Sequence, residues 1–221
     1  ASSYGGVMAI DRHLYSTIPA TDFRRKCWVD FTLDGMTQEN AINELKNYSN
    51  YPERVYKSGK ENAKYGLGGL SLKFRNVAGK ADVKYDAWCV SVPLMRIEEM
   101  KLIEAEAAGM QDEARGKALL EAFAKTRDPQ YVYGTHTDAY YNNSTSLFQN
   151  EVWWQRRVEL WGEGFATFDI KRLNKGIIRS YAGTNHLENA RWNTQELPNW
   201  MVWTFIGTEA DNNGGMTQNP N

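Results

Sequence analysis

The second half of the chain carries the clearest hydrophobic periodicity. Residues 93–110, PLMRIEEMKLIEAEAAGM, begin with proline, lack further Gly or Pro before Gly109, and consist mostly of strong helix formers. After the short GMQD connection, residues 113–129 read EARGKALLEAFAKTRDP. Positions i, i+3, i+4 and i+7 of this segment share one helical face and are occupied by Gly116, Leu119, Leu120 and Phe123. We therefore predict two helices, the second stopped by its closing Asp-Pro pair.

A connection of about four residues forces these two helices to run nearly antiparallel. Three small residues, Ala105, Ala107 and Ala108, would let the partner helix approach closely. We therefore expect an αα-hairpin. Residues 129–146 then form a polar loop with four tyrosines, and apolar periodicity resumes at Leu147, where we predict the start of a third helix.

Residues 155–176, QRRVELWGEGFATFDIKRLNKG, interleave carboxylates with arginines. On a helical wheel Trp154, Val158 and Trp161 fall together, and the charged residues lie on the opposite side of the helix. The charged residues are Arg156, Glu159 and Glu163. Glycines on either side of Glu163 predict that the helix ends there and that FATFDIKRL forms the next one.

The first ninety residues contain few long periodic segments. Frequent Gly, Asn and Pro indicate loops with short helices or strands. Residues 69–76, GLSLKFRN, alternate apolar and polar side chains, which predicts a half-buried strand.

Composition narrows the class of protein. The 221 residues are 42% hydrophobic, so we expect one compact unit over residues 1–221. Lys plus Arg number 26 and Asp plus Glu 27, and no basic stripe is present, so nucleic acid is not an expected partner.

No apolar run reaches the roughly 18 residues of a membrane helix. The first thirty residues lack the pattern of a signal peptide, and the chain begins as if cut from a longer one.

Glu159 and Glu163 have two interpretations. As an acid/base pair they would suit glycoside hydrolysis, which needs two carboxyl groups. However, carboxylates on adjacent turns of one helix lie side by side instead of flanking a bond, and Arg156 and Arg157 are close enough to neutralise them. We favour ion pairs that clamp the helix end against neighbouring helices, with Asp169 and Arg172 doing the same in the next element.

No metal or cofactor site is predicted. The histidines lack the spacing of metal ligands, and DNNGG at 211–215 lacks the spacing and closing Glu of a calcium loop. Cys27 and Cys89 match neither a redox pair nor a zinc pattern, and a bridge between them stays open.

Four separated motifs resemble the C-terminal half of the SusD/RagB family. They are LYSTIPATDFRRKCWVD at 14–30, VPLMRIEEMKLIEAEAA at 92–108, QRRVELWGEGFATFDIKRL at 155–173 and MTQNPN at 216–221. The third is the most specific. Its family pattern is met at Arg156, Arg157, Glu159, Leu160, Glu163, Gly164, Phe168, Asp169, Lys171 and Arg172.

The resemblance implies a mainly α-helical fold of tetratricopeptide-type helix hairpins with long loops and a few short strands. It also implies non-catalytic capture of oligosaccharides at the outer membrane, beside a SusC-like TonB-dependent transporter. Family members are longer, lipid-anchored chains, so we expect this sequence to be a fragment without the anchor. Gln155 stands where the family more often has Glu.

A glycan platform needs exposed aromatic rings among polar side chains, because sugars stack on rings and hydrogen-bond through hydroxyls. Residues 131–143 supply Tyr131, Tyr133, Tyr140 and Tyr141 beside Asp138, Asn142 and Asn143. Residues 184–193 supply Trp192 with Asn185, Arg191 and Asn193. We take these five aromatics as candidate ligand contacts. The alternatives are a helical scaffold that grips protein and a glycoside hydrolase that uses Glu159 and Glu163.

Overall fold

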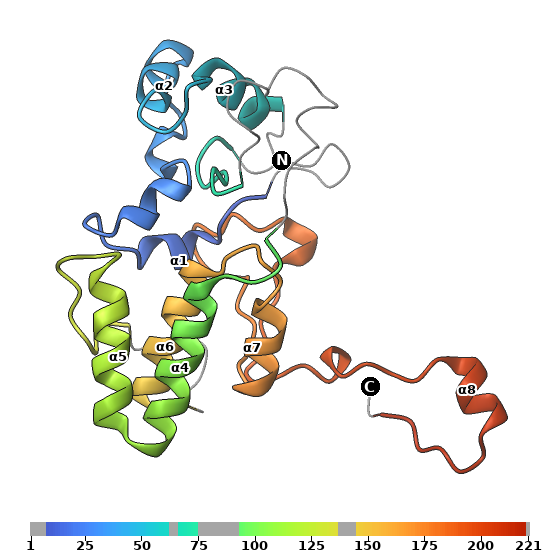
Figure 1. Ribbon diagram of the computed structural model, residues 1–221. Coiled ribbons are helices and arrows are strands. Elements are labelled where there is room, and N and C mark those ends of the chain that lie inside the picture. Colours follow the sequence, from blue (N-terminus) through green and yellow to red (C-terminus); the bar gives the residue numbers. More distant parts are fainter. Residues whose placement is uncertain (1–7, 62–65, 75–92, 137–144, 220–221) are drawn as a thin grey trace.

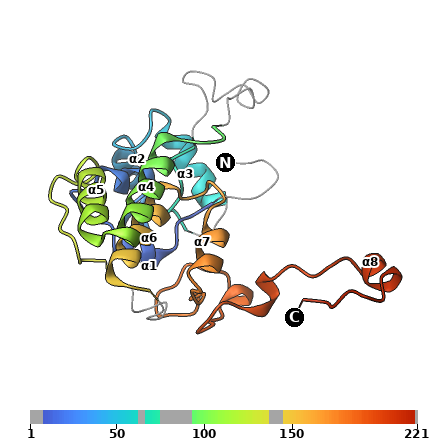
Figure 2. The ribbon, with the colours of Figure 1, turned by 60° about the horizontal axis from the view of Figure 1, so that its bottom comes forward.

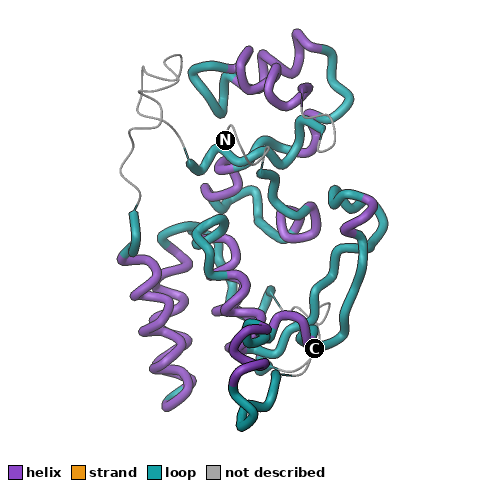
Figure 3. The backbone as a smooth tube through the Cα atoms, turned by 90° about the vertical axis from the view of Figure 1, so that its right-hand side faces the viewer, coloured by secondary structure: helices purple, strands orange, loops and turns teal. Residues whose placement is uncertain are grey.

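The computed structural model describes residues 8–61, 66–74, 93–136 and 145–219 (Figure 1). Within these ranges the chain is built of helices and loops, and it pairs as a strand only in isolated bridges. This confirms the predicted mainly α fold. The view in Figure 3 shows how much of the chain outside the helices runs as loop. Among the described residues, no helix is long and apolar enough to cross a membrane.

The first part of the chain forms short helices over two small cores. They are α1 (Arg12–Ser16), η1 (Phe23–Cys27), η2 (Phe31–Leu33), α2 (Gln38–Leu45) and α3 (Pro52–Glu61). One core joins α1 to Trp28 and to the α6 residues Trp154 and Val158. Val29, Leu45 and Leu70 belong to the other, which also contacts residues of α3. The first core therefore fixes the N-terminal segment against the helices of the second half.

The strand predicted over residues 69–76 is reduced to extended backbone between two other segments. Leu70 bridges Ala9 on one side, and Ser71 bridges Trp28 on the other. Residues 75 and 76 lie outside the described residues, as does Cys89 of the proposed cysteine bridge.

The predicted αα-hairpin is present as α4 (Ile97–Gln111) and α5 (Glu113–Lys125), which lie side by side in Figure 1. Two glycines meet across this contact: a Cβ built on Gly116 would lie 2.3 Å from the Cα of Gly109. Ala105 and Ala108 are buried at this contact, but Ala107 is exposed, so its predicted role was wrong.

The start of α4 is four residues later than Pro93 suggested. Arg96 has an extended backbone, with φ −125° and ψ 151°, and caps the helix without a side-chain hydrogen bond. Its guanidinium instead binds carboxylates at the end of α6. A tertiary contact therefore sets this boundary, and local helix propensity does not reveal it.

The third predicted helix, α6 (Leu147–Glu159), begins at the predicted residue. Ser146 and Gln149 form a capping box, which satisfies the first free N–H groups of the helix. The helix is buried almost all round, including Glu151, Gln155, Arg156 and Glu159. The predicted polar side of α6 is therefore not exposed to solvent, because charged residues of other elements pack against it.

After the two glycines the chain forms α7 (Ala166–Arg172), as predicted, and then mostly loops. Gly162 and Gly164 have φ of 76° and 92°, conformations that favour glycine. Two short turns, η4 (Glu188–Ala190) and η5 (Asn199–Met201), precede α8 (Gly207–Asn212). Figures 1 and 2 show the segment that carries α8 extended away from the other helices.

Candidate functional site

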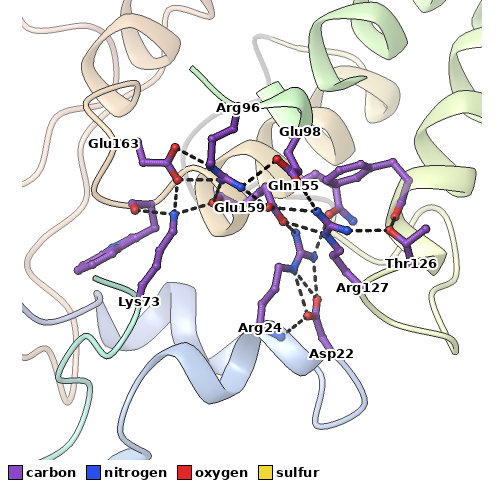
Figure 4. Close-up of polar contacts among 12 residues, drawn as sticks. Asp22, Arg24, Lys73, Arg96, Glu98, Thr126, Arg127, Gln155, Glu159 and Glu163 are labelled. Carbon is purple, nitrogen blue, oxygen red and sulfur yellow. Dashed lines mark hydrogen bonds and ion pairs between the residues drawn. The ribbon is translucent and has the colours of Figure 1, made fainter. Parts of the chain in front are cut away.

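Glu159, the last residue of α6, lies at the centre of a charge cluster (Figure 4). Its carboxylate accepts hydrogen bonds from Arg24 Nη1 at 3.2 Å, Arg96 Nη1 at 3.1 Å and Arg127 Nε at 3.1 Å. Only 7% of Glu159 is exposed. Three arginines from three separate segments of the chain therefore converge on one buried carboxylate.

Glu163, in the turn after α6, completes the cluster. It accepts from Arg96 Nε at 3.0 Å and Nη2 at 2.8 Å, and it forms an ion pair with Lys73. Lys73 Nζ also donates to the backbone carbonyls of Glu159, at 2.7 Å, and Trp161, at 2.9 Å. The lysine thus satisfies carbonyl groups at the C-terminal end of α6.

Burial by itself would raise the pKa of both glutamates. For Glu159, hydrogen bonds and charges from Arg127, Arg24 and Arg96 outweigh burial and lower its pKa. Arg96 and Lys73 do the same for the pKa of Glu163. Both side chains are therefore ionised at neutral pH, and neither has the retained proton that a general acid requires.

The expected partners of these glutamates were wrong. Arg156 Nε forms two hydrogen bonds with Asp169, at 3.0 and 2.8 Å, and Arg157 stacks over Trp153 at 4.5 Å. Arg172 binds Asp169 and also Glu106 of α4. The predicted ion pairs are present at Glu159, Glu163 and Asp169, but the partners of the two glutamates come from distant parts of the chain.

The described part of the tyrosine loop is tied to α6. Tyr131 is only 6% exposed, and its hydroxyl donates to Glu151 at 2.8 Å. The backbone N–H groups of Gly134 and His136 also donate to Glu151, at 2.9 and 2.7 Å. The ring of Tyr131 is therefore held in the core, so the structure contradicts its proposed role as a stacking surface.

The other tyrosines have different surroundings. Tyr133 is half-buried, with Lys117 Nζ 4.4 Å from the centre of its ring. Tyr140 and Tyr141 lie outside the described residues. Of the four, only Tyr133 is described with part of its surface open.

Trp192 belongs to an aromatic cluster that is partly open to solvent. Its ring meets Trp200 edge to face at 5.6 Å, and the guanidinium of Arg179 lies 4.7 Å from its centre. Trp200 is 60% exposed. We call Arg179, Trp192 and Trp200 the tryptophan platform.

Two polar side chains expected beside Trp192 instead make hydrogen bonds to backbone groups of the protein itself. Asn193 Oδ1 accepts from the backbone N–H groups of Arg179, at 3.0 Å, and Ser180, at 2.8 Å. Asn185 Nδ2 donates to the Ile10 carbonyl at 2.9 Å. These residues shape the loop, and Arg179 supplies the charged group beside the ring.

Sequence reasoning missed three residues of this region: Arg179, Trp200 and Trp203. Trp203 is 83% exposed. The signal was present in LPNWMVWTF, residues 197–205, where two tryptophans three positions apart stand in a stretch without helical or strand periodicity. Among the described residues, no group of three His, Cys, Asp or Glu side chains is placed to hold a metal.

Comparison with known proteins gives one match. The model of a family described as the SusD family matches residues 9–221. No curated protein and no solved structure matches the chain.

Proposed function

Because the chain belongs to the SusD family, whose members are known for glycan binding in nutrient uptake, we propose that it binds oligosaccharides at the cell surface without catalysis. In this proposal the whole protein is lipid-anchored on the extracellular face of the outer membrane. There it passes its ligand to a SusC-like TonB-dependent transporter.

The observation that carries the proposal is the tryptophan platform. Trp192 and Trp200 meet edge to face, so the pair offers two ring surfaces at different angles. Apolar ring faces suit the C–H faces of sugars, and Arg179 supplies hydrogen-bond donors beside them. Exposed aromatic clusters of this kind often mark binding sites.

The first prediction concerns the platform. We expect Trp192→Ala to weaken oligosaccharide binding about tenfold, because it removes a ring face of the kind that contributes about 1 kcal/mol or more to a stacked contact. Isothermal titration calorimetry against a panel of plant and microbial oligosaccharides measures the effect. Phe23→Ala, an exposed aromatic on η1, is the matched control. Unchanged affinity in Trp192→Ala would show that the oligosaccharide binds elsewhere on the protein.

The second prediction concerns catalysis, since the rival function is a glycoside hydrolase that uses Glu159 and Glu163. Both carboxylates are ionised and surrounded by cations, so we expect no new reducing ends after long incubation with the same panel. Chromatography and a reducing-end assay check this. Release of sugar that disappears in Glu163→Gln would establish hydrolysis instead.

The third function is a scaffold that grips protein, and no specific contact among the described residues favours it. It would be supported if the chain purified with a transporter while titrations with every oligosaccharide stayed flat.

A further inference from the structure

A cavity of about 550 Å³ lies between the N-terminal segment, the end of α6, α7 and residues 176–186. Its volume falls within the range of small-molecule sites. The wall is mainly apolar, and its larger side chains are Trp153, Leu160, Trp161, Phe165, Ile170 and Ile177. Among the described residues proposed above as glycan contacts, only Arg179 lines it.

The charged groups of the cavity differ in what they already bind. Asp169 is held by Arg156, which also lines the cavity. Asp11 accepts hydrogen bonds from Tyr181 at 2.6 Å and from His186 at 3.1 Å. Both lining carboxylates are therefore paired within the protein.

Arg179 is the lining cation best placed to meet a ligand. Its guanidinium rests on the Trp192 ring, and no carboxylate in the part of the chain that the structure describes forms an ion pair with it. A guanidinium stacked on an aromatic face keeps its N–H edge available, and that edge matches a carboxylate fork. Arg179 also joins the cavity to the tryptophan platform.

We propose that this cavity binds the carboxylate-bearing ring of an acidic oligosaccharide, a uronic acid residue, with Arg179 pairing with the sugar carboxylate. The inference rests on the proposed glycan-binding function and names its ligand class. The neighbouring rings of the oligosaccharide would stack on Trp192 and Trp200, while the apolar wall at Trp161 and Phe165 receives the C–H face of the acidic ring.

Calorimetry on the 221-residue chain tests the ligand class. The probes are trigalacturonate and the same trisaccharide after its carboxylates are reduced to alcohols, together with the neutral panel used above. We expect trigalacturonate to bind at least about tenfold more tightly than its reduced form, because the reduced form cannot make the charge-assisted hydrogen bond. Added salt should weaken only the acidic form.

Two variants test whether the acidic sugar binds in the cavity and at Arg179. Arg179→Gln should lose most of the preference for the acidic form, whereas Arg115→Gln, the same charge change at an exposed position of α5, should leave it unchanged. Ala166→Phe narrows the cavity while keeping Arg179, and should weaken the acidic trisaccharide about tenfold or more. Circular dichroism verifies that each variant is folded.

The outcomes separate this proposal from the general function. Binding of neutral sugars with no preference for the acidic form, or acidic binding that survives both Arg179→Gln and Ala166→Phe, overturns the uronate site and leaves glycan binding intact. Flat titrations with every probe overturn both.

Discussion

At the scale of single residues, Glu159 shows how much one buried carboxylate depends on its partners. Three arginines satisfy it, and Arg24 is itself held by Asp22 at 2.7 Å. Breaking a buried ion pair by removing one charge is costly, because the remaining charges stay desolvated without compensation. The same carboxylate that suggested catalysis is better explained as the centre of a structural cluster.

The third prediction follows from this arrangement. We expect Glu159→Gln to lower the free energy of unfolding by about 3 kcal/mol, measured by urea denaturation. Glu121→Gln is the control, since its Lys117 and Lys125 partners are 4.0 Å away on the surface of α5. That variant should change stability by less than about 0.5 kcal/mol. Equal effects in the two variants would contradict the structural role of Glu159.

At the scale of elements, the α4–α5 hairpin depends on backbone contact. A Cβ on Gly116 would lie 2.3 Å from Gly109 Cα and 2.8 Å from the Ala105 carbonyl oxygen. Neither obstacle is the end of a flexible side chain, so the helices would have to separate to accept a methyl group.

The fourth prediction uses this contact. Although Ala favours helix more than Gly, we expect Gly116→Ala to destabilise the protein by about 1–3 kcal/mol, because overpacking outweighs propensity. Thermal unfolding followed by circular dichroism measures the change. Gly207→Ala, at the start of α8, is the same substitution where the added Cβ would meet no atom of another segment within 4 Å, and it should be neutral. A stabilised Gly116→Ala variant would show that the helices are farther apart.

At the scale of the whole molecule, ionised carboxylates hold distant segments together. The Glu159–Glu163 cluster joins η1, residue 73, the start of α4 and the end of α6. Glu151 joins residues 131–136 to α6, and its pKa is also lowered: hydrogen bonds and charge from His136, with the Tyr131 hydroxyl, outweigh the effect of burial. These contacts join segments that lie far apart along the chain.

The fifth prediction is the pH dependence of stability. A carboxyl group whose pKa is lower in the folded state stabilises the protein above its unfolded pKa, which for Glu is close to the ordinary value of 4.5. It loses that contribution as the pH falls through the folded pKa. We therefore expect the free energy of unfolding to fall below about pH 4.5. Glu159→Gln should show a shallower fall, and Glu121→Gln the same fall as the parent. Urea titrations at several pH values provide the measurement.

The sequence by itself determined the main helices of the second half of the chain and the family. Periodicity, the Asp-Pro stop at 128–129 and the glycine pair at 162 and 164 are local signals, so they placed α5, α6 and α7 to within a few residues. The motif at 155–173 likewise identified the family, because it is a contiguous pattern.

Only the tertiary structure decided which residues meet. Arg24, Lys73, Arg96 and Arg127 are far apart along the chain, and nothing in their local sequence indicates that they converge on Glu159 and Glu163. For the same reason the burial of Tyr131 and the placing of Arg179 on Trp192 could not be foreseen. Local patterns report the preferences of neighbouring residues, whereas pairing of buried charges and exposure of rings depend on packing between distant segments.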